Sequence, residues 1–325
     1  MKLCVTGGAG YVGSVVCEHL LAAGHDVTVV DNFSTGHRDA VPEGCALVEG
    51  DIRDARVLAR AIDASVEGVL HFAALSVVAD SVRHPLDYFD NNVGGTVALL
   101  RAMQAVGVGR FVFSSTAAVY GAPATLPIDE RALCAPENPY GWSKLAVEKV
   151  LEAAHASAGL RYVALRYFNA AGSTATRGED HRPESHLIPI VLDTALGARA
   201  SVTVFGDDYP TRDGTCLRDY IHVSDLADAH VRALAAMDGG FSGALNLGSE
   251  SGFTVLEIID ACERITGRAV ARAIGPRRAG DPPALVAASG RAAEVLGWTR
   301  RASSIDEIIR SAHAWRSAHP AGYAR

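Results

Sequence analysis

A tyrosine and a lysine four residues apart are the pair in this 325-residue chain most suited to chemistry. They are Tyr140 and Lys144, in the segment Tyr140-Gly141-Trp142-Ser143-Lys144. On a helix, residues four apart lie on the same face, about 5–6 Å from one another. The ammonium can therefore favour the ionised form of the phenol, whose pKa is normally about 10. This pairing predicts a base that acts near neutral pH, and a solvated surface pair is the alternative.

The scarcity of lysine favours the chemical interpretation. Of the 30 basic residues, only Lys2, Lys144 and Lys149 are lysine. A lysine offers a compact, hydrogen-bonding point charge that the planar guanidinium group of arginine does not reproduce. The lysine at position 144 is therefore interpreted as selected for its shape.

Hydroxyl groups are expected close to this pair. Ser114 and Thr116 close a predicted strand that begins at Arg110, and Tyr140 opens the helix that follows. A hydroxyl at the strand end could hold a substrate oxygen while Tyr140 moves its proton, as general acid-base catalysis requires. Tyr140 and Lys144, with a hydroxyl from Ser114, Ser115 or Thr116, are thus the predicted catalytic residues, and the family resemblance described below implies Thr116 as that hydroxyl. No G-x-S-x-G turn lies near them, which argues against a serine hydrolase.

The first 31 residues have the pattern of a nucleotide-binding unit. A short apolar strand runs into Gly7, Gly10 and Gly13, and a helical pattern follows. Such glycines let the backbone and the helix N-terminus approach a pyrophosphate. A second predicted strand, Asp26–Val30, is followed by Asp31, where an acid meets a ribose 2′-hydroxyl. A carboxylate there would repel a 2′-phosphate, so the sequence favours NAD over NADP.

Strands and helices alternate through the first half of the chain. Further strands are predicted at 46–48, 69–72 and 110–114, with helices at 53–63 and 85–106. This alternation predicts an α/β fold with a doubly wound parallel (Rossmann) sheet that binds ligands at the carboxyl ends of its strands. We expect an NAD-binding domain over 1–170 and a smaller C-terminal α/β substrate lobe over 171–325. Residues 222–237 are expected to pack back on the first domain.

Composition narrows the class of partner. A net charge of −7 and a pI near 5.9 argue against binding to nucleic acid or to an anionic membrane surface. The six cysteines form neither a C-x-x-C pair nor a disulfide framework, which is typical of a reducing compartment. We recognise no signal peptide and no membrane-spanning stretch. The prediction is a cytoplasmic protein that acts on small molecules.

Several motifs together resemble the UDP-glucose 4-epimerase family of the extended short-chain dehydrogenase/reductases. The G-x-x-G-x-x-G turn and the Tyr-x-x-x-Lys pair are shared with many members of that superfamily, whereas the last motif is more specific. The matching segments are Thr6–Gly13, Asp31–Gly36, Phe113–Gly121, Asn138–Lys144, Arg166–Gly172, and Phe205–Thr211 running on to Arg218–Val223. They extend over nearly the whole chain.

The resemblance implies a set of residues that contact NAD, in addition to the three glycines. They are Tyr11, Val12, Asp31, Asn32, Phe33, Ser34, Thr35, Gly36, Asp51, Ile52, Phe72, Ala73, Ala74, Leu75, Asn91, Ser114, Tyr140, Lys144 and Phe168.

The resemblance also implies a site for a UDP-sugar. By analogy with family dimers, it implies a homodimer in which helices near 85–106 and 140–158 pair. The substrate-binding residues would be Thr116, Tyr140, Asn169, His186, Leu187, Thr203, Val204, Phe205, Arg218, Arg278, Asp281 and Leu285. Arg218 and Arg278 are fork-shaped donors suited to a pyrophosphate. Leu285 matches the position that limits room at C2 of the sugar, which implies a preference for UDP-glucose and UDP-galactose over N-acetyl sugars. His181 and His186 could bind a metal, but we identify no carboxylate or cysteine partner for them, so no metal is predicted.

The implied activity is reversible epimerisation at C4 of UDP-galactose and UDP-glucose through a 4-keto intermediate, with tightly bound NAD. Epimerisation of another UDP-sugar, such as UDP-GlcNAc, a UDP-pentose or a UDP-uronate, stays open. A sugar-nucleotide 4,6-dehydratase is a further alternative, although its acids are absent where this chain has Ala117-Ala118. A catalytically silent NAD sensor is the alternative outside enzymes, and it would not need Tyr140 and Lys144.

Overall fold

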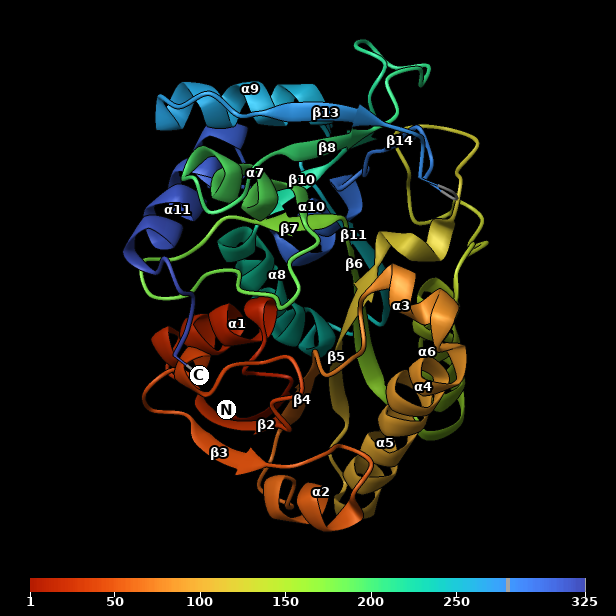
Figure 1. Cartoon of the computed structure of the whole chain (residues 1–325). Helices are drawn as coiled ribbons and strands as arrows, with labels where there is room; N and C mark the ends of the chain where they lie inside the picture. The colour runs from red at the N-terminus through yellow and green to blue at the C-terminus, as the bar shows by residue number, and fades with distance from the viewer. Residues whose placement is uncertain (279–280, 325) are drawn as a thin grey trace.

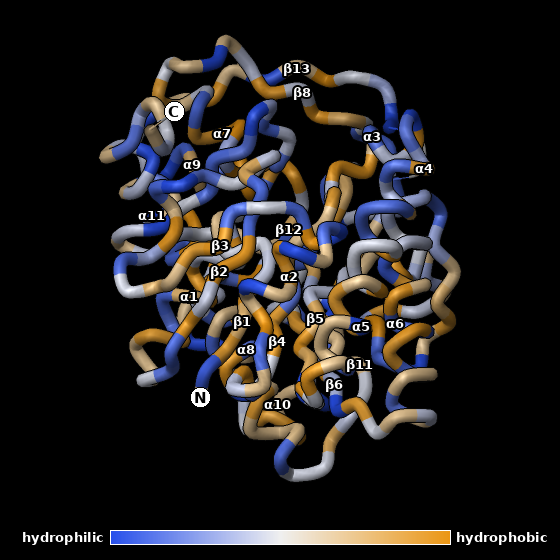
Figure 2. The backbone as a smooth tube through the Cα atoms, turned by 90° about the horizontal axis from the view of Figure 1, so that it is seen from below, coloured by the Kyte–Doolittle hydropathy of each residue, from blue (hydrophilic) through white to orange (hydrophobic). Residues whose placement is uncertain are grey.

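A seven-stranded parallel sheet forms the centre of the molecule. The computed structural model describes residues 1–278 and 281–324. The strands are β1 (Lys2–Thr6), β2 (Asp26–Asp31), β3 (Ala46–Glu49), β4 (Gly68–His71), β5 (Arg110–Thr116), β6 (Arg161–Tyr167) and β11 (Gly243–Leu247). Their order is β11-β6-β5-β4-β1-β2-β3. Figure 2 shows hydrophobic residues along the strands in the middle of the sheet, where β1 and β4 are almost fully buried.

Helices cover both faces of this sheet. The helices α1 (Tyr11–Ala22), α8 (Val223–Asp238) and α10 (Gly290–Leu296) share a hydrophobic core with one face. The helices α2 (Ala55–Ala61), α5 (Gly95–Val106) and α6 (Pro139–Ala158) pack on the other face. The short helices α3 (Val78–Arg83) and α4 (Pro85–Tyr88) pack against α6. The prediction of a doubly wound α/β fold is therefore confirmed.

The elements expected from the sequence are largely present, with three differences. The expected helix over 85–106 is divided into α4, a π-helical turn at Phe89–Gly94, and α5. Strands β6 and β11 were not expected. Residues 223–247 return to the sheet, a longer segment than the expected 222–237. Helix α8 packs against α1, and β11 pairs with β6. The division of the chain into two domains stays a prediction.

The remaining elements gather beyond the carboxyl edge of the sheet. Helices α7 (Leu187–Ala195), α9 (Val255–Thr266) and α11 (Ile305–Ala318) pack with β8 (Val202–Phe205) and β13 (Arg272–Gly275) at the top of Figure 1. Small pairings complete this part: β7 (Asn169–Ala171) with β10 (Tyr220–His222), and β9 (Leu217–Arg218) with β12 (Phe253–Thr254) and β14 (Ala284–Leu285). Among the described residues, no helix combines the length and apolarity needed to cross a bilayer.

Candidate active site

The glycine turn after β1 leaves backbone exposed where a pyrophosphate would lie. Gly7 has φ +74°, and a Cβ there would lie 2.4 Å from the backbone nitrogen of Ala73. A Cβ on Gly13 would lie 2.2 Å from the carbonyl oxygen of Gly7. Gly10 precedes α1, whose first residues are Tyr11 and Val12. Only glycines permit this approach, so the turn fits the phosphates of a dinucleotide at a helix N-terminus.

The loop after β2 is held against the glycine turn. The carboxylate of Asp31 accepts hydrogen bonds of 2.9 Å from the backbone N–H groups of Ala9 and Phe33. Burial raises the pKa of Asp31, and these two hydrogen bonds act in the opposite direction. Gly36 lies so close to Ala9 that a Cβ would be 2.9 Å from its carbonyl carbon. The predicted cofactor residues at 31–36 therefore adjoin the predicted pyrophosphate site.

Two further groups of predicted cofactor residues follow β3 and β4. Asp51 faces Asn32 across 3.4 Å, and the Arg53 guanidinium lowers the pKa of Asp51 to about 2. Ile52 is buried beneath α5, while Phe72, Ala73, Ala74 and Leu75 continue directly from β4 and are partly buried. These residues extend the same edge of the sheet, as predicted.

A residue that the sequence did not reveal joins this edge to α6, the helix that carries the predicted catalytic residues Tyr140 and Lys144. The buried side chain of Asn92 accepts a hydrogen bond from the N–H of Leu75 at 2.8 Å. It also donates to the Leu75 carbonyl at 3.0 Å and to the hydroxyl of Ser143 at 2.9 Å. Asn91, the predicted neighbour, lies in the same π-helical turn. Asn92 was missed because its partners lie 17 and 51 residues away along the chain, a relation that no local pattern records.

Helix α6 presents Tyr140 and Lys144 on its first turns. The Asn138 side chain caps the helix by accepting from the Gly141 N–H at 2.9 Å, and Pro139 begins it. A Cβ on Gly141 would lie 2.6 Å from the carbonyl oxygen of Ala118, so glycine allows the helix to approach the turn that follows β5. Thr116 caps that turn by accepting from the Ala118 N–H at 3.1 Å. The predicted catalytic residues are thus brought together.

Lys144 is buried, with 3% of its surface exposed. Its Nζ donates to the carbonyl oxygen of Ser114 at 2.8 Å and lies 6.0 Å from the centre of the Tyr140 ring. Burial lowers the pKa of Lys144 to about 7, and the negative charge of Glu148 acts in the opposite direction.

Tyr140 differs from the expectation that its neighbour would favour ionisation. Loss of water around the phenol raises the pKa of Tyr140, and the hydroxyl of Thr116 offsets this only in part. The cause is that burial acts on both partners: it disfavours the phenolate and the ammonium alike. In the protein alone the phenol is therefore neutral near pH 7.

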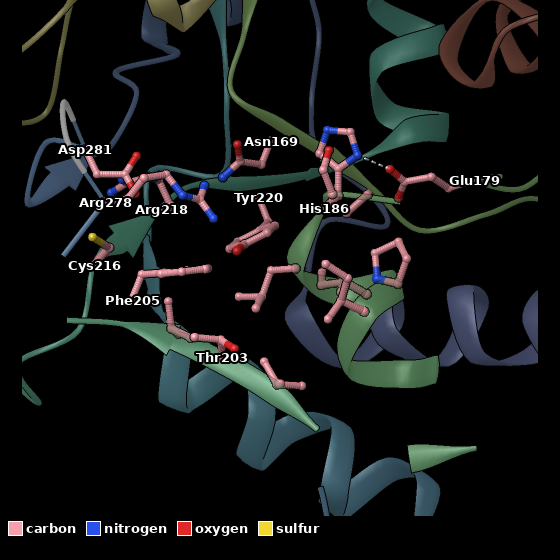
Figure 3. Close-up of a pocket in the computed structure, with 18 of the residues that line it drawn as sticks. Asn169, Glu179, His186, Thr203, Phe205, Cys216, Arg218, Tyr220, Arg278 and Asp281 are labelled. Carbon is pink, nitrogen blue, oxygen red and sulfur yellow. Dashed lines mark ion pairs between the residues drawn. The ribbon is translucent and has the colours of Figure 1, made fainter. Parts of the chain in front are cut away.

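A pocket lies beside this edge, and Figure 3 shows its lining. Eight of the twelve predicted substrate residues line it: Asn169, His186, Leu187, Thr203, Phe205, Arg218, Arg278 and Asp281. Arg218 pairs with Asp281 at 3.5 Å, and the Arg278 guanidinium lies 4.5 Å from the centre of the Phe205 ring. One end of the pocket therefore carries two guanidinium groups close to an aromatic face.

The pocket adjoins the predicted catalytic residues through β5 and β6. Thr116 is paired in register with Tyr167, and Asn169, two residues further along, lines the pocket. Phe168 lies between them in a buried cluster that also contains Ala117. A ligand in the pocket would therefore reach towards Thr116 and Tyr140.

Four predicted substrate residues do not line this pocket: Thr116 and Tyr140, which lie at the neighbouring sheet edge, and Val204 and Leu285. The side chain of Val204 is fully buried in the core, because Thr203 and Phe205 take the exposed positions of the alternating strand β8. The backbone of Val204 is therefore the part that could contact a ligand, and the role of this residue stays a prediction. Leu285 in β14 packs against the cluster of Ala117 and Phe168, and it is paired in register with Arg218 of the pocket wall.

The family model of the NAD dependent epimerase/dehydratase family matches residues 3–248. The chain belongs to that family. It is 50% identical to the UDP-glucose 4-epimerase of Lacticaseibacillus casei over 327 residues, with 99% of each chain covered. The resemblance inferred from the motifs is therefore confirmed.

Solved structures from this family share the fold at high similarity. One crystal structure of a UDP-glucose 4-epimerase has a TM-score of 0.97 and 46% identity, covering 100% of both chains. The UDP-glucose 4-epimerase of Bifidobacterium longum, in complex with NAD+ and UDP, has a TM-score of 0.94 and 38% identity. It covers 99% of this chain and 100% of its own.

Proposed function

We propose that this protein interconverts UDP-galactose and UDP-glucose by inverting C4 of the sugar, with NAD as a tightly bound cofactor. The observation that carries the proposal is the position of Tyr140, next to Thr116 and Lys144 and beside a pocket that contains Arg218 and Arg278. Membership of the family and similarity to UDP-glucose 4-epimerases along the whole chain support it. The predicted cofactor and substrate residues are proposed in those roles on the same grounds, Val204 through its backbone only.

The proton of the sugar 4-hydroxyl is moved by Tyr140. NAD+, when bound, would supply a reversible hydride acceptor and a positive charge, which would favour the phenolate that burial alone disfavours. Thr116 holds the 4-oxygen by a hydrogen bond, and Lys144, fixed by the Ser114 carbonyl, stabilises the phenolate. Tyr140 takes the proton as the 4-ketone forms and returns it when the ketone is reduced.

Inversion requires the sugar to turn while the nucleotide stays in place. Arg218 and Arg278 are the donors proposed to hold the diphosphate, since guanidinium groups bind phosphate oxygens with two parallel hydrogen bonds. The 4-keto sugar, held only through its UDP group, presents its other face for reduction. Firm binding of UDP and weak binding of the hexose are therefore both needed.

A cytoplasmic homodimer is the proposed state of the protein. Large apolar side chains are exposed on the helices that would pair: Leu86 is 81% exposed, Trp142 48% and Phe89 38%. Their burial between two copies would remove this apolar surface from water. Light scattering that gives the mass of a monomer would contradict the dimer.

The decisive experiment is to incubate purified protein with UDP-galactose and to follow UDP-glucose by NMR without added cofactor. We expect conversion in both directions to the same equilibrium mixture. Release of a 4-keto-6-deoxy sugar would instead identify a dehydratase. Turnover of only a UDP-pentose, UDP-uronate or N-acetyl sugar would identify another 4-epimerase. No turnover of any UDP-sugar by folded, NAD-loaded protein would refute an enzymatic role.

A further inference from the structure

A cluster of two histidines and two carboxylates lies before α7, outside the catalytic edge. Its members are Glu179, His181, Glu184 and His186, and one ligand atom from each lies within 4.8 Å of the others. The sequence prediction of no metal depended on the histidines having no carboxylate partners. The structure supplies both partners from the same short segment, with the side chains of Glu179 and Glu184 only 8% and 10% exposed.

Both histidines of the cluster lie within ion-pair distance of both carboxylates. The Nδ1 atom of His186 is 2.8 Å from Glu179 Oε1 and 3.3 Å from Glu184 Oε1. The Nδ1 atom of His181 is 3.2 Å from Glu179 Oε1 and 3.7 Å from Glu184 Oε2. Bonds of about 2.0–2.1 Å from Zn²⁺ to nitrogen or oxygen place tetrahedral ligands about 3.3 Å apart. The histidine–carboxylate separations are close to that value, with a different oxygen of Glu184 facing each histidine. The four ligand atoms lie within 4.8 Å of one another, so small side-chain movements would bring one atom of each residue to an ion.

Two atoms of the cluster also lack a conventional partner. Within residues 1–278 and 281–324, His181 Nδ1 and Glu184 Oε2 are buried without a hydrogen bond, although they face one another. The other oxygen of Glu184 is fixed by the backbone N–H groups of Ser185 and His186, both at 2.8 Å. Buried polar atoms without hydrogen bonds are costly, and coordination of an ion is one way to satisfy them.

We propose that Glu179, His181, Glu184 and His186 bind one divalent transition-metal ion, with Zn²⁺ as the best match. Two imidazole and two carboxylate donors suit Zn²⁺, whereas Mg²⁺ and Ca²⁺ prefer oxygen ligands alone. The His186 side chain is 57% exposed and gives the ion a path of entry. Figure 3 shows His186 turned towards Glu179 at the wall of the pocket.

The ion would have a structural role between the two binding regions. The ring of His181 meets the ring of Tyr11, at the start of α1, edge-on with centres 6.2 Å apart. His186 directly precedes α7 and lines the pocket. A metal held by both histidines would fix the segment that connects the predicted pyrophosphate site to the predicted UDP site.

The proposal is tested by measuring metal binding to the full-length, untagged protein, after a strong chelator has removed any bound metal. Titration with zinc chloride should show one saturable site by calorimetry, and mass spectrometry of the metal should give one equivalent. Glu184→Gln and His181→Gln should each weaken Zn²⁺ binding by more than about 100-fold. Loss of a residue that only hydrogen-bonds to a metal ligand weakens binding by at most about that factor. His84→Gln, at an exposed histidine outside the cluster, should bind as the wild type does.

Two measurements on the wild type need no variant. Co²⁺ in place of Zn²⁺ should give the intense visible bands of a four-coordinate ion. Zn²⁺, but not Mg²⁺, should raise the melting temperature by several degrees. Absence of saturable Zn²⁺ binding, or equal affinity in the wild type and Glu184→Gln, would show that the cluster is only a network of ion pairs. These experiments use no UDP-sugar, so the metal site and the proposed function are tested separately.

Discussion

Replacing Lys144 with methionine should make the protein more stable while it abolishes catalysis. The ammonium is buried, and its pKa falls from 10.5 to about 7. A tenfold change in proton affinity corresponds to about 1.36 kcal/mol, so burial of the charge costs roughly 4–5 kcal/mol. Methionine keeps most of the side-chain volume. It loses the hydrogen bond to the Ser114 carbonyl, which contributes roughly 1.5 kcal/mol. The expected net gain at pH 7 is therefore about 3 kcal/mol.

The sign of the pH dependence follows from the same shift. The unfolded chain keeps the Lys144 proton up to about pH 10.5, whereas the folded protein releases it near pH 7. Between these values the unfolded state binds more protons, so this lysine makes the wild type more stable as the pH rises. The methionine variant lacks that contribution. Its advantage should be largest at pH 7 and below, and should disappear towards pH 10.

The assay is denaturant unfolding of both proteins, freed of bound nucleotide, from pH 7 to pH 10. Lys149→Met is the matched control, because Lys149 lies on the same helix with its side chain 64% exposed and paired to Glu152. The control should change stability by less than about 0.5 kcal/mol at every pH. A Lys144→Met variant that is less stable than the wild type at pH 7, or whose difference is constant with pH, would refute the reasoning.

Three other outcomes are expected. Tyr140→Phe should lower kcat by roughly 10²–10⁴ with little change in KM, and near-normal steady-state turnover would exclude Tyr140 as the acid-base group. Gly141→Ala should destabilise the fold by roughly 1–3 kcal/mol in thermal melts, because its Cβ would lie 2.6 Å from the Ala118 carbonyl oxygen. The control is Gly109→Ala, which should not destabilise the fold because a Cβ there meets nothing within 4 Å. With Leu285 in place, kcat/KM should be higher for UDP-glucose and UDP-galactose than for their N-acetyl forms, and equal values would contradict this.

The sheet was predictable where local patterns are strong. Strands β1 to β5 are apolar runs that end in polar or small residues, and the sequence alone places each within a few residues. Strand β11 (Gly243–Leu247) is as long as β1 but was missed, and its partner β6 lies about 80 residues earlier. Such a pairing depends on contacts across the fold, which no local pattern records.

The candidate site shows the same limit. Motifs place the pocket residues well, because Asn169, Arg218 and Arg278 are recognisable in sequence and do line one pocket. Alternation along β8 could have removed the Val204 side chain from that set. The pKa of Tyr140 could not be anticipated, since it depends on burial by residues far along the chain.

The amide of Asn92 has a consequence for how variants of this protein are interpreted. Through its bonds to Leu75 and Ser143, it fixes the loop after β4 to the helix that carries Tyr140. Disturbing that amide would shift nucleotide affinity and turnover together. A screen that measures activity alone would therefore group Asn92 with the acid-base residues. Its role, however, is to hold the loop after β4 at a fixed distance from α6.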